Sequence, residues 1–475
     1  MTRRFTGFLM LSSRELALLT LLFVCSLPAV TARLYSSDEV QYFSYLRSLW
    51  FDHDVSFENE YQYFYDHGIA QSAAFHQTFL ELQTPAGRRI NYGTIGCAVL
   101  WSPFYGAADI VARAARAAGY DVAVDGYSRP YIMAVAYGSA FYGFATIVLG
   151  IAAARRILGA GAVASGLAVW GGTPILFYMY VAPPFSHACS AFSVALFVTV
   201  WLHVRPTWTV RGAVALGLSG SIVAMVREQD LLFTVPPAID YVLTQWNRAR
   251  NSPDYRPGTS IAPAAGGCVA FAIGYLPQLL AYEALNGGPR PSELVMRKMN
   301  WIAPHALQVL ASPEHGLVFW TPLAVLSLAG LVVLATRGDA ARRRVGACLL
   351  LMVALQVYIS GAVESWTVAG AFGQRRFVSI TLLLVVGLAA LRQAVPARAP
   401  RTLLNVTIAL CVWWNVALMA EFGTGLMDRQ RLEPGRNAYD AFVTLPRMAP
   451  DLLYRYLMHR SSFYKPPAVP PQEQH

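Results

Sequence analysis

Long apolar runs separated by short polar connections dominate the sequence. Runs of about 17–25 apolar residues are long enough to cross a bilayer as helices. The pattern indicates an all-α polytopic membrane protein whose residues 1–422 form one transmembrane domain. It predicts about eleven spans, near residues 15–32, 130–152, 160–181, 186–203, 211–226, 229–246, 262–283, 317–336, 345–363, 377–392 and 402–421.

The composition supports a membrane location. Hydrophobic residues make up 55% of the chain and charged residues 13%, and the mean hydropathy is +0.41. Soluble domains are typically about 25% charged. The first apolar run, 16–30, could be a secretory signal cleaved near "AVTA" at 29–32, but the spans that follow favour a retained first helix.

The arginines indicate the topology, because short cytoplasmic loops carry the excess of positive charge. With the N-terminus inside, the inner loops hold Arg155, Arg156, Arg205, Arg211, Arg248, Arg250, Arg256, Arg337, Arg342, Arg343, Arg344, Arg392, Arg398 and Arg401. The outer loops then hold Asp38, Glu39, Asp52, Asp54, Glu58, Glu60, Asp66, Glu81, Glu293, Glu314 and Glu364. The net charge of +10 is therefore a feature of membrane topology and does not indicate nucleic-acid binding. We expect an inner (cytoplasmic) membrane protein with its chemistry on the periplasmic or exterior face.

Three polar segments are expected on that outer face. Residues 33–129 form a long first loop, in which 94–112 is too polar at its flanks to cross fully and fits an interfacial helix. Residues 284–316 form a second long loop. The C-terminal part, 423–475, is a polar tail whose end, "KPPAVPPQEQH", has a composition typical of disorder.

Two adjacent carboxylates, Asp38 and Glu39, follow the first span directly. Ser36 and Glu39 have the spacing of a capping box, so helix capping explains the pair without any chemistry. A catalytic acid pair at the membrane surface is the alternative. Neighbouring helix positions point about 100° apart, so one carboxylate would face a cavity while the other capped the helix or bound a partner.

Charged residues also interrupt apolar segments at two later places. Arg227, Glu228 and Asp230 break a long apolar region, and ionisable groups at membrane depth are often functional. Arg375 and Arg376 lie at an outer helix end, against the positive-inside trend. An arginine fork suits phosphate oxygens, although interfacial arginines can also simply extend toward water.

The remaining candidates are histidines and aromatic residues at outer membrane edges. They comprise His187, His305, His315, Trp320 and Tyr92. Aromatic belts and ordinary hydrogen bonding explain such residues equally well. The six cysteines are far apart without C-x-x-C spacing, so neither a zinc site nor a disulfide framework is indicated.

Several motifs together resemble the GT-C membrane glycosyltransferases of the protein O-mannosyltransferase and aminoarabinose-transferase type. They are "DE" after the first helix, the interfacial "NYGTIGCAVLWSPFYGAAD", "SPEHGLVFWTPLAVLSLAGL" at 312–331 and "GAFGQRRFVSITLLLVVGLAAL" at 370–391. The resemblance covers about residues 10–420.

The resemblance implies a polyprenyl-phosphate sugar as donor and transfer of a mannose-like hexose or a pentose to a lipid, glycan or protein. It implies that an acid of the first outer loop is the general base or helps to hold a divalent metal, Mg²⁺ or Mn²⁺. That role falls on Asp38, with Glu39 beside it. Arg375, Arg376 and Arg227 are the candidates for binding the donor phosphate.

Two other classes remain open. A lipid or sugar transporter or flippase would also have many spans, although it usually shows paired broken helices in two related halves. A glycan ligase or polymerase would be expected to carry its large outer loop late in the chain. Release of polyprenyl phosphate from a lipid-linked sugar distinguishes a transferase from a transporter.

Overall fold

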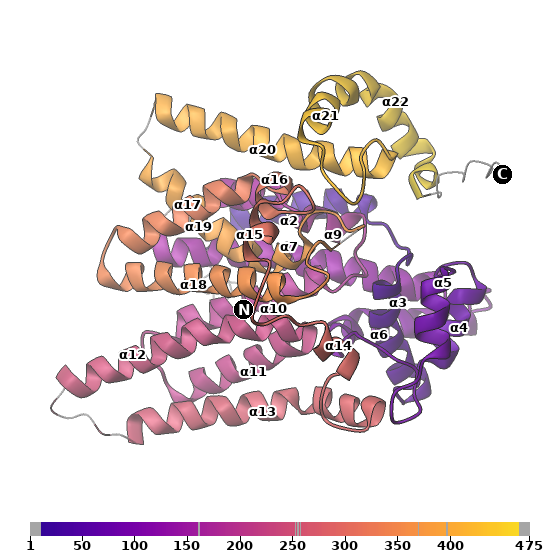
Figure 1. Cartoon of the computed structure of the whole chain (residues 1–475), viewed down its shortest axis with the longest axis horizontal. Helices are drawn as coiled ribbons and strands as arrows, with labels where there is room; N and C mark the ends of the chain where they lie inside the picture. Colours follow the sequence, from indigo (N-terminus) through magenta and orange to yellow (C-terminus); the bar gives the residue numbers. More distant parts are fainter. Residues whose placement is uncertain are drawn as a thin grey trace.

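The computed structural model describes residues 11–159, 162–251, 253, 256, 258–368, 370–395 and 398–464. In this part of the chain the regular structure is helical, and two isolated β-bridges are the only pairing of extended segments. Many of the long helices run along the long axis of the molecule (Figure 1). The predicted disordered end, from residue 465 onward, lies outside the described residues.

Every predicted span coincides with helical structure. The helices are α2 (Ser13–Ser26), α7 (Arg129–Leu158), α8 (Val163–Gly172) with α9 (Ile175–Tyr180), α10 (His187–Val204), α11 (Val210–Val226), α12 (Val235–Asn251), α13 (Gly258–Asn286), α16 (Leu317–Trp320) with α17 (Leu323–Thr336), α18 (Ala340–Ala362), α19 (Thr381–Ala394) and α20 (Ala399–Thr424). Two of the predicted spans are broken, before Pro174 and Pro322, because proline lacks the amide hydrogen that a continuous helix needs.

Six helices of the described residues are long and apolar enough to cross a membrane. They are Arg129–Leu158, His187–Val204, Ser260–Asn286, Ala340–Ala362, Arg375–Ala394 and Ala399–Thr424. Three shorter apolar helices, α8, α11 and α17, accompany them. The helical, multi-pass architecture is thus as predicted, whereas the number of eleven spans is not established.

The predicted outer loops gather at one end of the bundle. The first loop contains α3 (Ser37–Arg47), η2 (Ser48–Asp52), α4 (Glu58–Asp66), α5 (Ala73–Phe75), η3 (His76–Glu81) and α6 (Gly96–Ala117). The later loop contains α14 (Glu293–Arg297) and α15 (Ala306–Ala311). Figure 1 shows α3 to α6 and α14 toward one end, opposite the last turns of α12 and the first turns of α13.

An aromatic core holds the first loop together. Phe43 of α3 packs edge-on against Phe64 of α4 and Tyr105 of α6, with ring centroids 5.7 and 6.1 Å apart. The side chain of Asp109 accepts hydrogen bonds from Tyr131 and Trp50 at 2.7 and 3.2 Å. These contacts fix α3 and α6 against α7, and α6 is not among the six apolar spans.

The segment expected to be a polar tail is largely folded. Its elements are α21 (Pro434–Tyr439), η6 (Asp440–Thr444), α22 (Leu445–Met458) and η7 (Arg460–Tyr464). Ala441 and Leu445 form a small buried cluster with Ala417 of α20. Arg460 of η7 donates hydrogen bonds to the carbonyl of Pro28, 2.6 Å, and to Thr31 Oγ1, 3.0 Å, so η7 lies against the segment that follows α2.

Candidate active site at the loop end of the bundle

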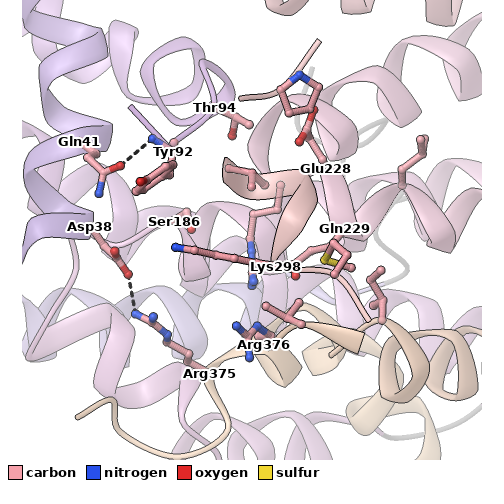
Figure 2. Close-up of a pocket in the computed structure, with 18 of the residues that line it drawn as sticks. Asp38, Gln41, Tyr92, Thr94, Ser186, Glu228, Gln229, Lys298, Arg375 and Arg376 are labelled. Carbon is pink, nitrogen blue, oxygen red and sulfur yellow. Dashed lines mark hydrogen bonds and ion pairs between the residues drawn. The ribbon is translucent and has the colours of Figure 1, made fainter. Parts of the chain in front are cut away.

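A cavity of about 490 Å³ lies where the predicted outer loops meet (Figure 2). Its walls come from α3, residues 92–94 before α6, the start of α10, the turn η4 (Glu228–Thr234), the 291–301 segment, the end of α18 and the turn η5 (Arg375–Ile380). Six predicted site residues line it: Asp38, Tyr92, His187, Arg227, Arg375 and Arg376. Residues scattered over more than 300 positions of sequence therefore share one cavity.

Asp38 reaches the cavity from the first turn of α3. Ser36 caps this helix by accepting a hydrogen bond from Glu39 N at 3.3 Å. Arg375, at the start of η5, donates to Asp38 Oδ2 at 2.7 Å, and Figure 2 shows the two side chains facing each other. The Asp38 side chain is 37% exposed and that of Arg375 24%. The pair is thus accessible from the cavity, and the helix N-terminus favours the carboxylate.

Glu39 points elsewhere. Its buried carboxylate accepts hydrogen bonds from the backbone amides of Tyr35, 2.8 Å, and Ser36, 3.0 Å. Burial raises the pKa of Glu39 to about 8. Glu39 does not line the cavity. The two predicted carboxylates are therefore divided between two tasks: Asp38 faces the cavity, and Glu39 completes the capping box.

Arg227 enters the cavity because α11 ends one residue earlier. Gly96 at the start of α6 packs on that end so closely that a Cβ there would lie 2.3 Å from the backbone of Val226. Thr94 Oγ1 also donates to the Val226 carbonyl at 2.8 Å. Arg227 then adopts an extended conformation, with φ −154° and ψ 116°, so α11 does not continue through it. The contacts of Thr94 and Gly96 with the end of α11 thus position the Arg227 side chain.

His187 and Arg227 are buried together at one side of the cavity. Arg227 Nη1 lies 3.3 Å from His187 Nδ1. A guanidinium can only donate, so Nδ1 must accept and the ring hydrogen must sit on Nε2. His187 Nε2 has no hydrogen-bond partner among the described residues. The histidine is consequently a neutral hydrogen-bond donor at the cavity wall.

Arg376 is held by its own loop. Its Nη1 donates to the Ser365 carbonyl at 2.9 Å and its Nη2 to Ser365 Oγ at 3.2 Å. Gln356 of α18 donates to the Arg376 carbonyl at 2.7 Å. The preceding turn requires Gly373, whose φ is +62° and whose Cβ would meet Pro174 at 2.8 Å. The backbone around Arg375 and Arg376 is therefore fixed on both sides.

Two charged lining residues, Lys298 and Glu228, were absent from the predicted site. Lys298 Nζ lies 4.8 Å from the centre of the Tyr92 ring, and the Lys298 carbonyl accepts from Glu364 N at 2.8 Å. Glu228 accepts a hydrogen bond from Tyr275 at 3.2 Å. The sequence did contain signals for both. Lys298 is one of only two lysines in the chain, and Glu228 lies in the charged break already noted.

Positive charge exceeds negative charge around the cavity. Four cations line it, Arg227, Lys298, Arg375 and Arg376, together with two carboxylates, Asp38 and Glu228. In the ranges that the structure describes, only Arg375 of these cations forms an ion pair with an acid. Arg227 and Arg376 are 8% and 7% exposed. Buried arginines without an acid partner are stabilised by an anionic ligand, and phosphate oxygens suit their planar forks.

The predicted divalent metal is not supported by the residues present. Magnesium and manganese take several oxygen ligands in one place. Asp38 is bonded to Arg375, and Glu39 is bonded to backbone amides away from the cavity. No group of three His, Cys, Asp or Glu side chains comes together in the described part of the chain. The donor set of the described residues does not fit Mg²⁺ or Mn²⁺.

The architecture has a counterpart among solved structures. No protein-family model and no curated protein sequence matches the chain. The structure is similar to the crystal structure of ArnT from Cupriavidus metallidurans bound to undecaprenyl phosphate, with a TM-score of 0.53 and 14% identity. The match covers 96% of this chain and 79% of that one. The chain has the GT-C fold. The resemblance predicted from the sequence motifs is confirmed at the level of the fold.

Besides Glu39, three predicted site residues lie outside the cavity of this GT-C fold. His315 is buried, stacks on Trp320 with ring centroids 4.7 Å apart, and donates from Nε2 to the Ala371 carbonyl at 2.9 Å. His305 stacks on Trp366 at 5.3 Å. Their rings bind the loops to one another, so the structure corrects the expectation that His305, His315 and Trp320 line the cavity. A sequence position at an outer membrane edge therefore does not show whether a histidine or aromatic residue packs inside the protein or contacts a ligand.

Proposed function

We propose that the protein is a membrane glycosyltransferase that moves a hexose or pentose from a polyprenyl-phosphate donor to a lipid, glycan or protein acceptor. The observation that carries this proposal is the cavity in which an accessible carboxylate, Asp38, lies beside three cations, Arg227, Lys298 and Arg376, that form no ion pair with an acid among the described residues. The GT-C fold supports it, and so does the undecaprenyl phosphate in the ArnT structure. We place the protein in the inner (cytoplasmic) membrane, with the cavity toward the periplasm or exterior.

In this proposal Arg227, Arg376 and Lys298 bind the donor phosphate. Arg227 and Arg376 are largely withdrawn from water, which strengthens charge-assisted hydrogen bonds to phosphate oxygens. Lys298 adds a compact charge from the opposite loop. His187 Nε2, a donor without a partner among the described residues, is a further contact for a phosphate or sugar oxygen. Arg375 is assigned a different task, because it already bonds Asp38.

Asp38 is the proposed general base. The acceptor hydroxyl or amine attacks the anomeric carbon, its proton passes to Asp38, and the bond from that carbon to the phosphate oxygen breaks. The bonding electrons leave with polyprenyl phosphate, an anion stable enough to need no strong acid. The surrounding cations stabilise the charge that develops on it. Arg375 holds Oδ2 of Asp38, and within the described residues no donor occupies Oδ1, which can take the proton.

The test uses the purified full-length protein in lipid nanodiscs. A polyprenyl-phosphate sugar is added with a cell-envelope extract as the source of acceptors. We expect polyprenyl phosphate to be released together with a glycosylated product, and Asp38→Asn to slow both by on the order of 10²–10⁴. In proteoliposomes, passage of the intact lipid-linked sugar across the membrane without cleavage would instead identify a transporter or flippase and refute the proposal.

A further inference from the structure

The C-terminal unit, residues 434–458, folds back along α20. Trp413 Nε1 of α20 donates to the Ala441 carbonyl at 3.2 Å. Asn437 Nδ2 donates to Glu421 Oε2 at 2.6 Å, in a buried contact. Figure 1 shows α21 and α22 beside the end of α20. The unit is therefore packed against the side of a candidate membrane span instead of extending away from it.

The position of these contacts along α20 sets their depth. With 26 residues, α20 is about 39 Å long, whereas the apolar layer of a bilayer is about 30 Å thick. Trp413 precedes the last residue, Thr424, by eleven positions, which is about 16 Å along the axis. A span centred in the layer would project about 5 Å at each end. Ala441 then lies at the level of the apolar layer, and Glu421 lies near its edge.

Only part of the apolar surface of α22 packs against α20. Leu445 is buried against α20, and Leu452 packs in the same cluster. At 100° per residue, Leu453 and Leu457 lie about 80° and 120° around the helix from Leu445. They are 60% and 65% exposed. An apolar strip therefore continues beyond the packed strip and has no partner in the described chain.

The charged residues of α22 lie on the other side. Arg447, Asp451 and Arg455 fall about 200°, 240° and 280° from Leu445. Arg455 pairs with Asp451 at 4.0 Å. A helix with one apolar face and an arginine-bearing polar face is typical of segments that lie in the plane of the membrane interface.

The exposed strip is continuous with the surface of the span. Phe442, 50% exposed, and Tyr439, 59% exposed, flank the point at which Ala441 meets Trp413. Trp413 and Val416 of α20 are themselves 38% and 39% exposed. A membrane-spanning helix presents such residues to lipid. The apolar strip that adjoins them therefore contacts lipid as well.

We propose that the apolar face of residues 439–457 is immersed in the leaflet at the cavity end of the bundle, with Arg447 and Arg455 at the phospholipid headgroups. Tyrosine at the boundary and arginine extending toward water suit that position. The partner is the phospholipid leaflet around α20. This inference rests on the membrane span and does not depend on the reaction in the cavity.

Fluorescence quenching tests the proposal with the full-length protein in nanodiscs. The exposed native cysteines are first removed as Cys25→Ala and Cys268→Ala. An environment-sensitive probe is then attached to Leu457→Cys or, at a second site, to Phe442→Cys. The matched control is Asp451→Cys, on the polar side of the same helix. Size-exclusion profiles identical to that of the parent show that each labelled protein is folded.

We expect phospholipids with a spin label on the acyl chain to quench the probes at 442 and 457 several-fold more than the probe at 451. Iodide in the water should show the opposite order. Equal iodide quenching at all three positions would overturn the proposal, because the strip would then face water. Protection at 442 and 457 from both quenchers would also overturn it, because protein, including a second copy of the chain, would then cover the strip.

Discussion

Two aspartate–arginine groups at opposite ends of the bundle differ in what surrounds them. Asp240 of α12 is fully buried and accepts hydrogen bonds from Arg205 Nε, 3.1 Å, and Trp201 Nε1, 3.1 Å, while Arg344 lies 3.6 Å away. Asp38 has one cation partner and is 37% exposed. The 18 residues of α10, about 27 Å, separate His187 at the cavity from Arg205.

The comparison distinguishes arginines that pair with an acid of the protein from arginines whose charge can bind an anionic ligand. At the Asp240 end the protein itself supplies both charges, and no oxygen of the carboxylate is left for another molecule. At the cavity end Arg227 and Arg376 have no acid partner in the part of the chain that the structure describes. The same residue types thus hold helices together at one end and provide unmatched charge at the other. The following changes separate these two roles.

Asp38→Asn should have the largest effect of these changes. It should lower turnover without lowering stability. Asparagine keeps the size of the side chain and suits a helix start, but it cannot accept a proton. Loss of a general base costs on the order of 10²–10⁴ in rate. The melting temperature should stay close to that of the parent because the pair is partly exposed. Turnover and thermal unfolding of the same preparation check both statements, and near-normal turnover would remove Asp38 from the catalytic role.

Asp240→Ala should affect stability and leave turnover per folded molecule unchanged. Its loss leaves Arg205 and Arg344 without their carboxylate, and breaking a buried ion pair costs about 3–5 kcal/mol. Thermal unfolding in detergent measures the loss. Asp339→Ala is the matched control, because Asp339 is an exposed aspartate near an arginine at the same end of the bundle, and it should cost far less. Equal melting temperatures for the two variants would contradict the structural role of Asp240.

A third carboxylate, Glu39, is buried like Asp240 but has no cation partner among the described residues. Its pKa is about 8 in the folded protein and near 4.5 when unfolded. Between these values the folded protein holds a proton that the unfolded chain has released, so stability falls as the pH rises. The slope is at most about 1.4 kcal/mol per pH unit for one proton.

Glu39→Gln should remove that slope while keeping the capping contacts, because an amide can accept the same backbone hydrogen bonds. Melting temperatures measured between pH 5 and pH 8 compare the variant with the parent. We expect the parent to lose stability over this range and the variant to change less. Parallel curves would show that Glu39 does not titrate there.

The sequence allowed the helices to be predicted, and part of the cavity with them. Apolar runs locate the spans, because lipid requires continuous apolar helices. Arg375 and Arg376 were identifiable because they contradict the charge bias of outer helix ends. The bond from Arg375 to Asp38 was not predictable, since 337 positions separate them and no local pattern encodes it.

Other features depend on packing that a sequence pattern does not contain. Lys298 reaches the cavity only because its loop is bonded to the end of α18, through Asn300 N and the Ala362 carbonyl at 2.6 Å. His315 and Trp320 have the composition of a site, but they stack on each other in the interior. In the C-terminal segment, scattered arginines and prolines obscured the amphipathic pattern of α22.

The smallest of these effects is expected for the cavity arginines. Arg376→Ala should weaken donor binding by about 1.5–3 kcal/mol, because one charge-assisted contact to phosphate is lost. This corresponds to roughly 10- to 150-fold in Kd. Arg376→Lys should recover only part, since lysine keeps the charge but not the planar fork.

Arg344→Ala provides the control from the opposite end of the bundle. It removes a partner of Asp240, so it should lower the melting temperature and leave donor affinity intact. Titration of each purified variant with undecaprenyl phosphate, followed by tryptophan fluorescence or native mass spectrometry, gives the affinities. If Arg376→Ala bound the lipid phosphate as tightly as the parent, Arg376 would not be a phosphate ligand. If Arg344→Ala weakened binding equally, the distinction between matched and unmatched arginines would fail, because the loss would then come from general destabilisation of the bundle.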